Sequence, residues 1–186
     1  MTAPAAPIEL PKTSNDAPFV INHLFNAPLE LVWQVYTQPE HLRQWMRPAG
    51  LSDAGSSVDL RVGGVFHYGM GTPDGKVMWG KWTFLAIEPP RQGVAKMVVV
   101  VSFSDAQQGV TRHPMAADWP LQTLSTATYT AEGADSNQTR LRLQWQACNA
   151  TDVEQAVFNS SHASMAQGWG GTLKMLEAYL QKIQTA

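Results

Sequence analysis

Among the side chains of this 186-residue sequence that could do chemistry, five are histidines, and His162 has the most informative position. His162 falls on the predicted inner face of a C-terminal helix, near Phe158 and Met165. An imidazole there could hydrogen-bond a ligand or act as an acid or base. The alternative, which we favour, is a histidine that bonds a backbone group of the sheet or lies at the rim of a cavity. The histidines are not spaced as metal-ligand pairs, so the sequence predicts no metal site and no cofactor.

Tyr68 is the second candidate, because it shares an apolar strand face with Phe66 and Met70. A buried phenol needs a hydrogen-bond partner, and a ligand can supply it. Asp59 and Arg61 lie two residues apart on one side of a predicted strand, where they could hold a polar group of a ligand. We favour a surface ion pair between them, worth less than about 1 kcal/mol.

The sequence lacks the motifs HExxH, CxxC and GxSxG, as well as GxxxxGK followed by Ser or Thr. These motifs bring catalytic or phosphate-binding groups together, so we predict no catalytic residues. An enzyme of the cyclase or hydrolase type, with His162, Tyr68 or Asp59 as acid or base, ranks third among our hypotheses because no coupled set of residues is visible.

Three helices are predicted, and the longest lies at the C-terminus. Residues 28–36 and 39–46 have apolar residues at helical spacing, each with a proline near the first position, and Pro48 and Gly50 end the second pattern. Residues 151–183 are predicted to form one amphipathic helix whose inner face repeats at steps of three and four. That face carries Phe158, His162, Met165, Trp169, Thr172, Leu176 and Leu180.

Strands fill the chain between these helices. Alternating or continuous apolar residues predict them, and Thr-Pro-Asp-Gly at residues 72–75 indicates a hairpin turn. Pro89 and Pro90 are expected to end one strand, and residues 104–120 form a long connection. The predicted strands cover residues 19–25, 58–62, 66–70, 77–87, 94–103, 121–131 and 139–148.

This order of elements predicts an α+β fold, with an antiparallel sheet and helices against one of its faces. Residues 18–186 form a single domain, long enough for a substantial core. Residues 1–17 are rich in Ala and Pro and are expected to form a flexible tail. This tail lacks the basic start and apolar run of a signal peptide.

Composition excludes several classes of partner. The net charge is −2 and the basic residues are scattered, so we predict no nucleic-acid binding. The sequence contains no apolar run long enough for a membrane span. Cys148 is the only cysteine, so no intrachain disulfide can form, and we expect its thiol to be buried and inert. We predict a cytoplasmic protein, although a secreted protein poor in cysteine would have the same pattern. Seven Trp and eight Met suit an irregular interior or an apolar cavity.

Four stretches of sequence carry a family resemblance through their order and spacing. They are Asn26 to Trp33, Thr37 to Leu42 with Trp45, Asp59 to Gly64 with Phe66, and Gln167 to Leu173 before Leu176. Together with Ile87 to Arg91, they resemble the Hsp90 ATPase activator homologue family of the START-like (Bet v 1-like) superfamily. The resemblance covers about residues 17 to 184 and implies a helix-grip fold, in which a curved antiparallel sheet wraps a long C-terminal helix around a cavity.

Within that fold, three glycines of the C-terminal helix need an explanation, since each costs about 1 kcal/mol relative to Ala in a helix. We expect Gly168, Gly170 and Gly171 to let the helix approach the sheet or other helices closely. The alternative is a kink or a break in the helix at these residues.

The resemblance leaves the activity open, because the superfamily contains lipid and hormone binders, polyketide cyclases and chaperone regulators. Our leading hypothesis is a protein that binds a small, largely apolar ligand between sheet and helix. The predicted pocket residues are Phe66, Tyr68, Met70, Trp82, Trp145, Phe158, His162, Met165 and Trp169. The same residues could instead fill the interior completely.

The second hypothesis is a protein-interaction module, either a chaperone co-regulator or a homodimer. Trp45, Met46, Trp79 and Trp119 lie near predicted loops or helix ends and could form an exposed apolar patch. In the eukaryotic chaperone activators, a homologous domain follows another domain that engages the chaperone. We do not recognise that second domain in these residues, so the resemblance alone does not imply chaperone contact.

Overall fold

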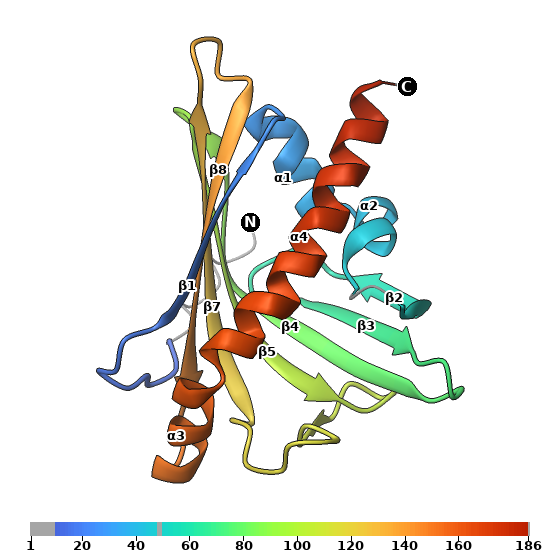
Figure 1. Ribbon diagram of the computed structural model, residues 1–186, viewed down its shortest axis with the longest axis vertical. Helices are drawn as coiled ribbons and strands as arrows, with labels where there is room; N and C mark the ends of the chain where they lie inside the picture. Colours follow the sequence, from blue (N-terminus) through green and yellow to red (C-terminus); the bar gives the residue numbers. More distant parts are fainter. Residues whose placement is uncertain (1–9, 48–49, 186) are drawn as a thin grey trace, which may run out of the picture.

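Eight strands of the computed structural model form one antiparallel sheet, and a long C-terminal helix crosses it (Figure 1). The structure describes residues 10–47 and 50–185, and the numbers of strands and helices hold for those residues. The sheet order is β1-β8-β7-β5-β4-β3-β2, with β6 paired to β5. The strands are β1 (Phe19–Phe25), β2 (Ser52–Val58), β3 (Val65–Gly71), β4 (Val77–Arg91), β5 (Val94–Ser104), β6 (Val110–Thr111), β7 (Gln122–Glu132) and β8 (Gln138–Cys148). The helices are α1 (Leu29–Thr37), α2 (Pro39–Trp45), α3 (Asp152–Ser160) and α4 (His162–Gln184).

This arrangement confirms the predicted α+β class and the helix-grip fold. Figure 1 shows the sheet turning from β1, β8 and β7 toward β5, β4 and β3, with α4 running diagonally over its hollow side. Helices α1 and α2 lie beside the C-terminal half of α4. The indole Nε1 of Trp45 donates to the carbonyl oxygen of Val35 at 3.0 Å, which fixes α2 against α1.

The two halves of α4 are packed differently. Thr172, Leu173, Leu176 and Leu180 are buried at steps of one, three and four, so the C-terminal half seals the core. No residue from 162 to 171 is fully buried. The N-terminal half therefore covers the sheet without filling the space beneath it.

The single helix predicted over residues 151–183 is in fact two helices, and the break lies at Ser161. Thr151 begins α3 with a capping box, in which its hydroxyl accepts the Glu154 N–H and the Glu154 carboxylate accepts the Thr151 N–H. At the other end, the hydroxyls of Ser160 and Ser161 both donate to the carbonyl oxygen of Val157. Such side-chain bonds compete with the helical ladder, which accounts for the break.

Gly168, Gly170 and Gly171 neither break α4 nor serve close packing, which corrects both explanations offered for them. The helix is continuous through all three residues. Apart from the adjacent residues and the helix's own nearby backbone, no atom lies within 4 Å of the position that a Cβ would take at any of them. Alanine would therefore fit at each of these positions.

The strand predicted at residues 58–62 is wrong, because β2 ends at Val58 and a tight turn follows it. The N–H of Arg61 donates to the carbonyl oxygen of Asp59 at 2.9 Å, and the N–H of Gly64 donates to that of Arg61 at 2.8 Å. A Cβ on Gly64 would lie 2.1 Å from the Asp59 carbonyl oxygen, so only glycine fits there. The Asp59–Arg61 ion pair does form, at 2.9 Å, but across this exposed turn.

Strand β4 continues through Pro89 and Pro90 to Arg91, where the sequence predicted its end. The pairing with β5 shifts register between Glu88 and Arg91, so the two prolines occupy an irregular stretch where ladder hydrogen bonds are not required. Strand β1 has the predicted bounds, and the hairpin at residues 72–75 joins β3 to β4 as predicted. The expected connection at 104–120 contains the short strand β6.

The described part of the N-terminal segment lies against β8 and α3. The carbonyl oxygen of Lys12 accepts the Asn149 N–H at 2.9 Å, and Asn159 donates to the Asp16 carboxylate at 2.9 Å. Thr13 forms a bridge with Cys148, whose thiol is buried and has its pKa raised to about 12 by that burial. Residues 1–9 of the predicted tail and Pro48, the predicted helix end, lie outside the described residues. None of the described helices has both the length and the apolar character that crossing a membrane requires.

Candidate functional site

A hollow with two adjoining lobes lies between the N-terminal half of α4 and the sheet. We call the first the loop lobe, of about 300 Å³, and the second the helix lobe, of about 250 Å³. The loop lobe is lined by Tyr68, Met70, Gly80, Val101, Ser102, Phe103, His113, Trp119, Pro120, Thr123, Trp145, Ser164 and Met165. The helix lobe is lined by Met46, Arg47, Tyr68, Met70, Trp145, Met165, Gly168, Trp169 and Thr172.

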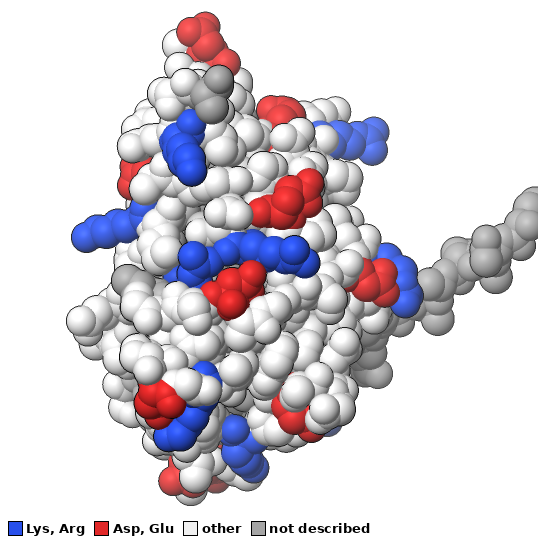
Figure 2. All heavy atoms as spheres, turned by 90° about the vertical axis from the view of Figure 1, so that its right-hand side faces the viewer, with Lys and Arg blue, Asp and Glu red and all other residues white. Residues whose placement is uncertain are grey.

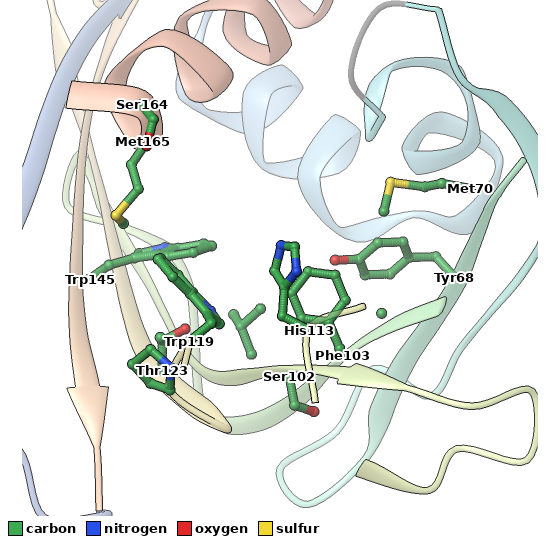
Figure 3. A pocket seen from close by; sticks show the side chains of 13 residues that line it. Tyr68, Met70, Ser102, Phe103, His113, Trp119, Thr123, Trp145, Ser164 and Met165 are labelled. Atoms are coloured by element: carbon green, nitrogen blue, oxygen red, sulfur yellow. The ribbon is translucent and has the colours of Figure 1, made fainter. Parts of the chain in front are cut away.

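Four side chains are common to both lobes, namely Tyr68, Met70, Trp145 and Met165. Figure 3 shows Met165 above Trp145 on one side of the loop lobe, with Tyr68 and Met70 on the other side. The Trp145 ring meets the Trp169 ring nearly at right angles, at 87° with 5.5 Å between centroids. These large, mostly apolar side chains make the shared wall of the hollow, a composition that suits an apolar molecule.

The phenol of Tyr68 is a polar group in the wall that the two lobes share. Gly80 lies opposite it on β4, and a Cβ there would come within 2.6 Å of the phenol ring, so the ring lies directly over the glycine. Phe66 stacks against the same ring at 4.9 Å between centroids. Burial raises the pKa of Tyr68 to about 12, so its hydroxyl keeps its proton at neutral pH and can donate a hydrogen bond.

His113 contributes a second polar group, from the connection between β6 and β7. Its Nδ1 accepts the backbone N–H of Met115 at 3.0 Å, which leaves the proton of the neutral ring on Nε2. Its ring meets Phe103 edge-on at 4.4 Å, and burial lowers the pKa of the imidazole. His113 is therefore neutral at pH 7. Figure 3 shows the imidazole and the Tyr68 hydroxyl facing the same interior space.

The connection that carries His113 and Trp119 is tied to the start of α3. Arg112 forms an ion pair with Glu154, the residue that completes the capping box of α3. The same guanidinium donates to the carbonyl oxygen of Trp119 at 3.4 Å. The Trp119 ring packs on Phe158 at 5.6 Å between centroids. The ion pair lowers the pKa of Glu154, so the link is charged at neutral pH.

The nine residues proposed from the sequence separate into three groups. Tyr68, Met70, Trp145, Met165 and Trp169 line the hollow. Phe66 and Trp82 are buried behind Tyr68 and support it, with their rings in edge contact at 5.2 Å. Phe158 and His162 belong to a neighbouring cluster with Phe19 and line neither lobe.

His162 lies in an apolar environment rather than in the hollow. Its ring centroid is 5.7 Å from that of Phe19 and 5.4 Å from that of Phe158, and its Nε2 is buried without a hydrogen-bond partner among the described residues. The structure therefore gives it neither a backbone bond to the sheet nor a place in the cavity. His162 is the first residue of α4, directly after the break at Ser161.

Sequence reasoning missed the contribution of the connection between β5 and β7. The sequence indicates only a loop position for His113, and it suggests an exposed patch for Trp119. The proposed patch does not exist as such, because Trp45 is fully buried, Trp119 lines the loop lobe, and Trp79 stacks flat on His67 at 4.7 Å. The only signal in the sequence was an aromatic residue beside Pro120 in a connection too long for a simple turn.

The described residues that line the two lobes supply apolar surface and a few hydrogen-bonding groups. None of the described lining residues is a carboxylate, so the lobes offer no acidic pair for acid–base catalysis. Within residues 10–47 and 50–185, no three His, Cys, Asp or Glu side chains lie close enough to share a metal ion. The Nε1 of Trp145 is buried and unpartnered among these residues.

Comparison with known protein families identifies the family of this chain. Residues 26–181 match the sequence model of the family described as "Activator of Hsp90 ATPase homolog 1-like protein". The chain belongs to this family. Comparison with functionally curated proteins gives no match. Membership in the activator of Hsp90 ATPase homolog 1-like family agrees with the helix-grip fold and is consistent with ligand-binding or co-chaperone-like roles.

Solved structures similar to this family member come from several bacteria. A crystal structure from Mycobacterium smegmatis is 24% identical, with a TM-score of 0.61 and coverage of 86% of this chain and 87% of the other. One from Nitrosomonas europaea is also 24% identical, with a TM-score of 0.60 and coverage of 91% and 97%. A solution structure from Arthrobacter aurescens is 23% identical, with a TM-score of 0.66 and coverage of 92% and 91%. At these identities the likeness shows the fold alone.

Proposed function

We propose that this protein binds a small, largely apolar molecule in the hollow between its sheet and α4. The observation that carries the proposal is the pair of adjoining lobes, about 300 and 250 Å³, walled by Trp, Met and Phe side chains. Small-molecule sites are typically apolar cavities of this size with a few placed polar groups. Tyr68 and His113 supply those groups here.

The polar groups favour a ligand that carries at least one hydrogen-bond acceptor. The protonated phenol of Tyr68 is a donor at neutral pH, and so is the Nε2–H of neutral His113. A ligand acceptor within reach of either group gains a hydrogen bond in surroundings of low polarity. The proposed role is carriage or sensing of such a molecule.

Thermal unfolding with 1-naphthol and decan-1-ol as probes tests the proposal. A ligand that binds only the folded state stabilises it by about 2.7 kcal/mol at a free concentration one hundred times its Kd. We expect either probe to raise the Tm, and native mass spectrometry of gently purified protein to show a retained small molecule. Unchanged Tm values together with a clean mass of the free protein would reject ligand binding.

Two variants locate the binding in the hollow. Ser164→Phe fills part of the loop lobe from an exposed position on α4, and should abolish the Tm shift. Ala163→Phe adds the same side chain at the neighbouring exposed position, which does not line the hollow, and should keep the shift. If both variants respond to the probes as the parent does, the molecule binds elsewhere.

Co-regulation of Hsp90 is a second candidate, and the family match alone favours it. The Trp residues proposed as a docking patch do not support it, because Trp45 is fully buried and Trp119 lines the loop lobe. An ATPase assay with purified Hsp90 distinguishes the two candidates. An unchanged rate of ATP hydrolysis over a concentration series of this protein would reject the chaperone role.

A further inference from the structure

The helix lobe contains one charged side chain among its described lining residues, the guanidinium of Arg47. Arg47 follows α2 and is half-buried, while the rest of the lobe is mostly Met, Trp and Tyr. Placing a cation at the edge of an apolar space is unfavourable unless it gains a partner. The position therefore calls for an explanation.

Hydrogen bonds within the protein engage only some of the N–H donors of the Arg47 guanidinium. Nη1 of Arg47 donates to the carbonyl oxygen of Arg43, which satisfies a free carbonyl at the end of α2. A guanidinium has five N–H donors in a planar fork, so donors remain for another acceptor. An anion with two oxygens matches that fork better than a neutral group does.

Arg43, four residues before Arg47, supplies a second guanidinium at the border of a small hollow that both residues line. Arg43 donates to the hydroxyl and the carbonyl oxygen of Ser56, each at 3.0 Å. Arg43, Arg47 and Asp53 border the same small hollow, but the Asp53 carboxylate accepts the Gly55 N–H at 3.0 Å. No described carboxylate lies within 4 Å of either guanidinium. Like charges four residues apart repel each other, and an anion between them would relieve that repulsion.

The attraction is local, since the molecule as a whole does not favour anions. Its net charge is −2. Figure 2 shows acidic and basic side chains interspersed over this side of the molecule, without an extended surface of one sign. The selectivity for an anion would therefore come from the arginines at the helix lobe.

We propose that the ligand is an anionic amphiphile, an inference that rests on the proposed function. Its anionic head, a carboxylate or a phosphate monoester, pairs with Arg47 at the helix lobe. Its apolar tail lies along Met46, Trp169 and Met165 and continues past Trp145 into the loop lobe. Because Tyr68, Met70, Trp145 and Met165 line both lobes, the proposed tail stays in contact with the same wall as it passes from one lobe to the other.

Binding measurements with three probes of equal chain length test this assignment: decanoate, decyl phosphate and decan-1-ol. We expect the parent protein to bind at least one of the anions at least about tenfold more tightly than the alcohol. Comparison of decanoate with decyl phosphate then identifies the head group. The preference for the anionic probes over decan-1-ol should become smaller as the salt concentration is raised.

Arg47→Gln should remove the preference for the anion and leave the affinity for decan-1-ol unchanged. Arg47→Lys, which keeps the charge but loses the fork, should retain part of the preference. Arg91→Gln removes an arginine from the distant β4–β5 hairpin and should bind all three probes as the parent does. Thermal unfolding of each variant checks that it folds.

The outcomes separate this inference from the function on which it rests. Equal binding of the alcohol and the anions, unchanged in Arg47→Gln, overturns the anionic assignment and leaves ligand binding intact. Failure of all three probes to bind argues against both. Loss of the anion preference in Arg91→Gln as well as Arg47→Gln would show a general effect of charge and would also overturn the assignment.

Discussion

The position of the Tyr68 phenol depends on the absence of a side chain at Gly80. Because the ring lies over this glycine, with 2.6 Å from Cζ to the position of a Cβ, Gly80→Ala must displace it. We expect the free energy of unfolding to fall by about 1–3 kcal/mol from overpacking, and the affinity for the probes to fall with it. Denaturant unfolding and a binding isotherm measure the two effects.

Gly69→Ala is the matched control, because it creates a similar clash on the opposite face of the sheet. A Cβ at Gly69 would lie 2.9 Å from the Trp79 ring, which stacks on His67 away from the hollow. This variant should lose stability without losing affinity in the fraction that remains folded. If Gly69→Ala weakens binding as much as Gly80→Ala, the position of the Tyr68 phenol does not determine the affinity for the probes.

His113 should make stability depend on pH in a defined direction. Burial lowers the pKa of the folded state below the ordinary value of 6.5, so the unfolded chain takes up a proton more readily. The contribution is fully present above about pH 6.5 and declines as the pH falls below it. We expect the free energy of unfolding of the parent to drop more between pH 7.5 and 5.5 than that of His113→Gln, since the other histidines act equally in both. If the free energy of unfolding depends on pH in the same way in the parent and in His113→Gln, the lowered pKa of His113 is contradicted.

At the scale of single residues, the alternation of side chains along a predicted strand correctly identified part of the candidate site. It placed Tyr68 and Met70 on the face of β3 that meets the hollow. The same alternation puts His67 on the opposite face of the strand and predicts that it is solvated. His67 is buried, with its Nε2 at 3.1 Å from the Ser104 hydroxyl and 3.0 Å from the Asp105 carbonyl oxygen. The alternation of side chains along a strand predicts which face of the sheet a residue lies on. Whether that face is buried depends on the neighbouring strands and loops that cover it.

The N-terminal half of α4 gives a prediction at the scale of the element. Gly168 and Gly171 have open space where a Cβ would lie, so Ala at either position should add about 1 kcal/mol to the free energy of unfolding through helix propensity. Gly168 lines the helix lobe and Gly171 does not. We expect both variants to be stabilised, but only Gly168→Ala to bind the probes differently.

Urea unfolding of the two glycine variants and one binding series supply the measurement. A loss of stability in Gly171→Ala would mean that the helix packs more closely there than the structure indicates. An identical binding response in both variants would remove Gly168 from the site. These glycines lower the stability of the helix beside the hollow, so their substitution also tests whether binding needs a less rigid α4.

Element boundaries were hardest to predict where local bonds outweigh periodicity. The apolar spacing across residues 151–183 is helical throughout, yet two serine hydroxyls at 160 and 161 bond to Val157 and end α3. Residues 58–62 alternate like a strand, yet backbone bonds close the turn from Asp59 to Gly64. Hydrophobic patterning records which side chains could be buried, and it does not record these competing hydrogen bonds.

At the scale of the whole molecule, the C-terminal half of α4 packs into the core that the sheet shares with α1 and α2. Leu176 is fully buried among residues from β1, α1, α2 and the sheet. Leu176→Ala should cost about 2–5 kcal/mol of the free energy of unfolding, because the surrounding elements cannot collapse into the void. Lys174→Ala, at an exposed position of the same helix, should stay within about 0.5 kcal/mol of the parent. Denaturant titrations compare them, and equal midpoints would contradict this account of the core.

The overall architecture was predictable because the order of elements allows few alternatives. One strand, two short helices, a run of hairpin-linked strands and a terminal helix leave an antiparallel sheet covered on one face. The hollow was not predictable to the same degree. Its loop lobe depends on the path of the chain from Arg112 to Pro120, which the Glu154 ion pair holds in place from the far end of the sequence.

The state of Cys148 has a practical consequence for measuring access to the hollow. Its thiol is the only one in the sequence, is buried, and has a pKa of about 12, so alkylating reagents will not find a thiolate there at neutral pH. A cysteine introduced at the rim would therefore be modified alone, without prior removal of the native one. The rate of its alkylation, with and without a bound molecule, would measure how far the ligand restricts access to the hollow in solution.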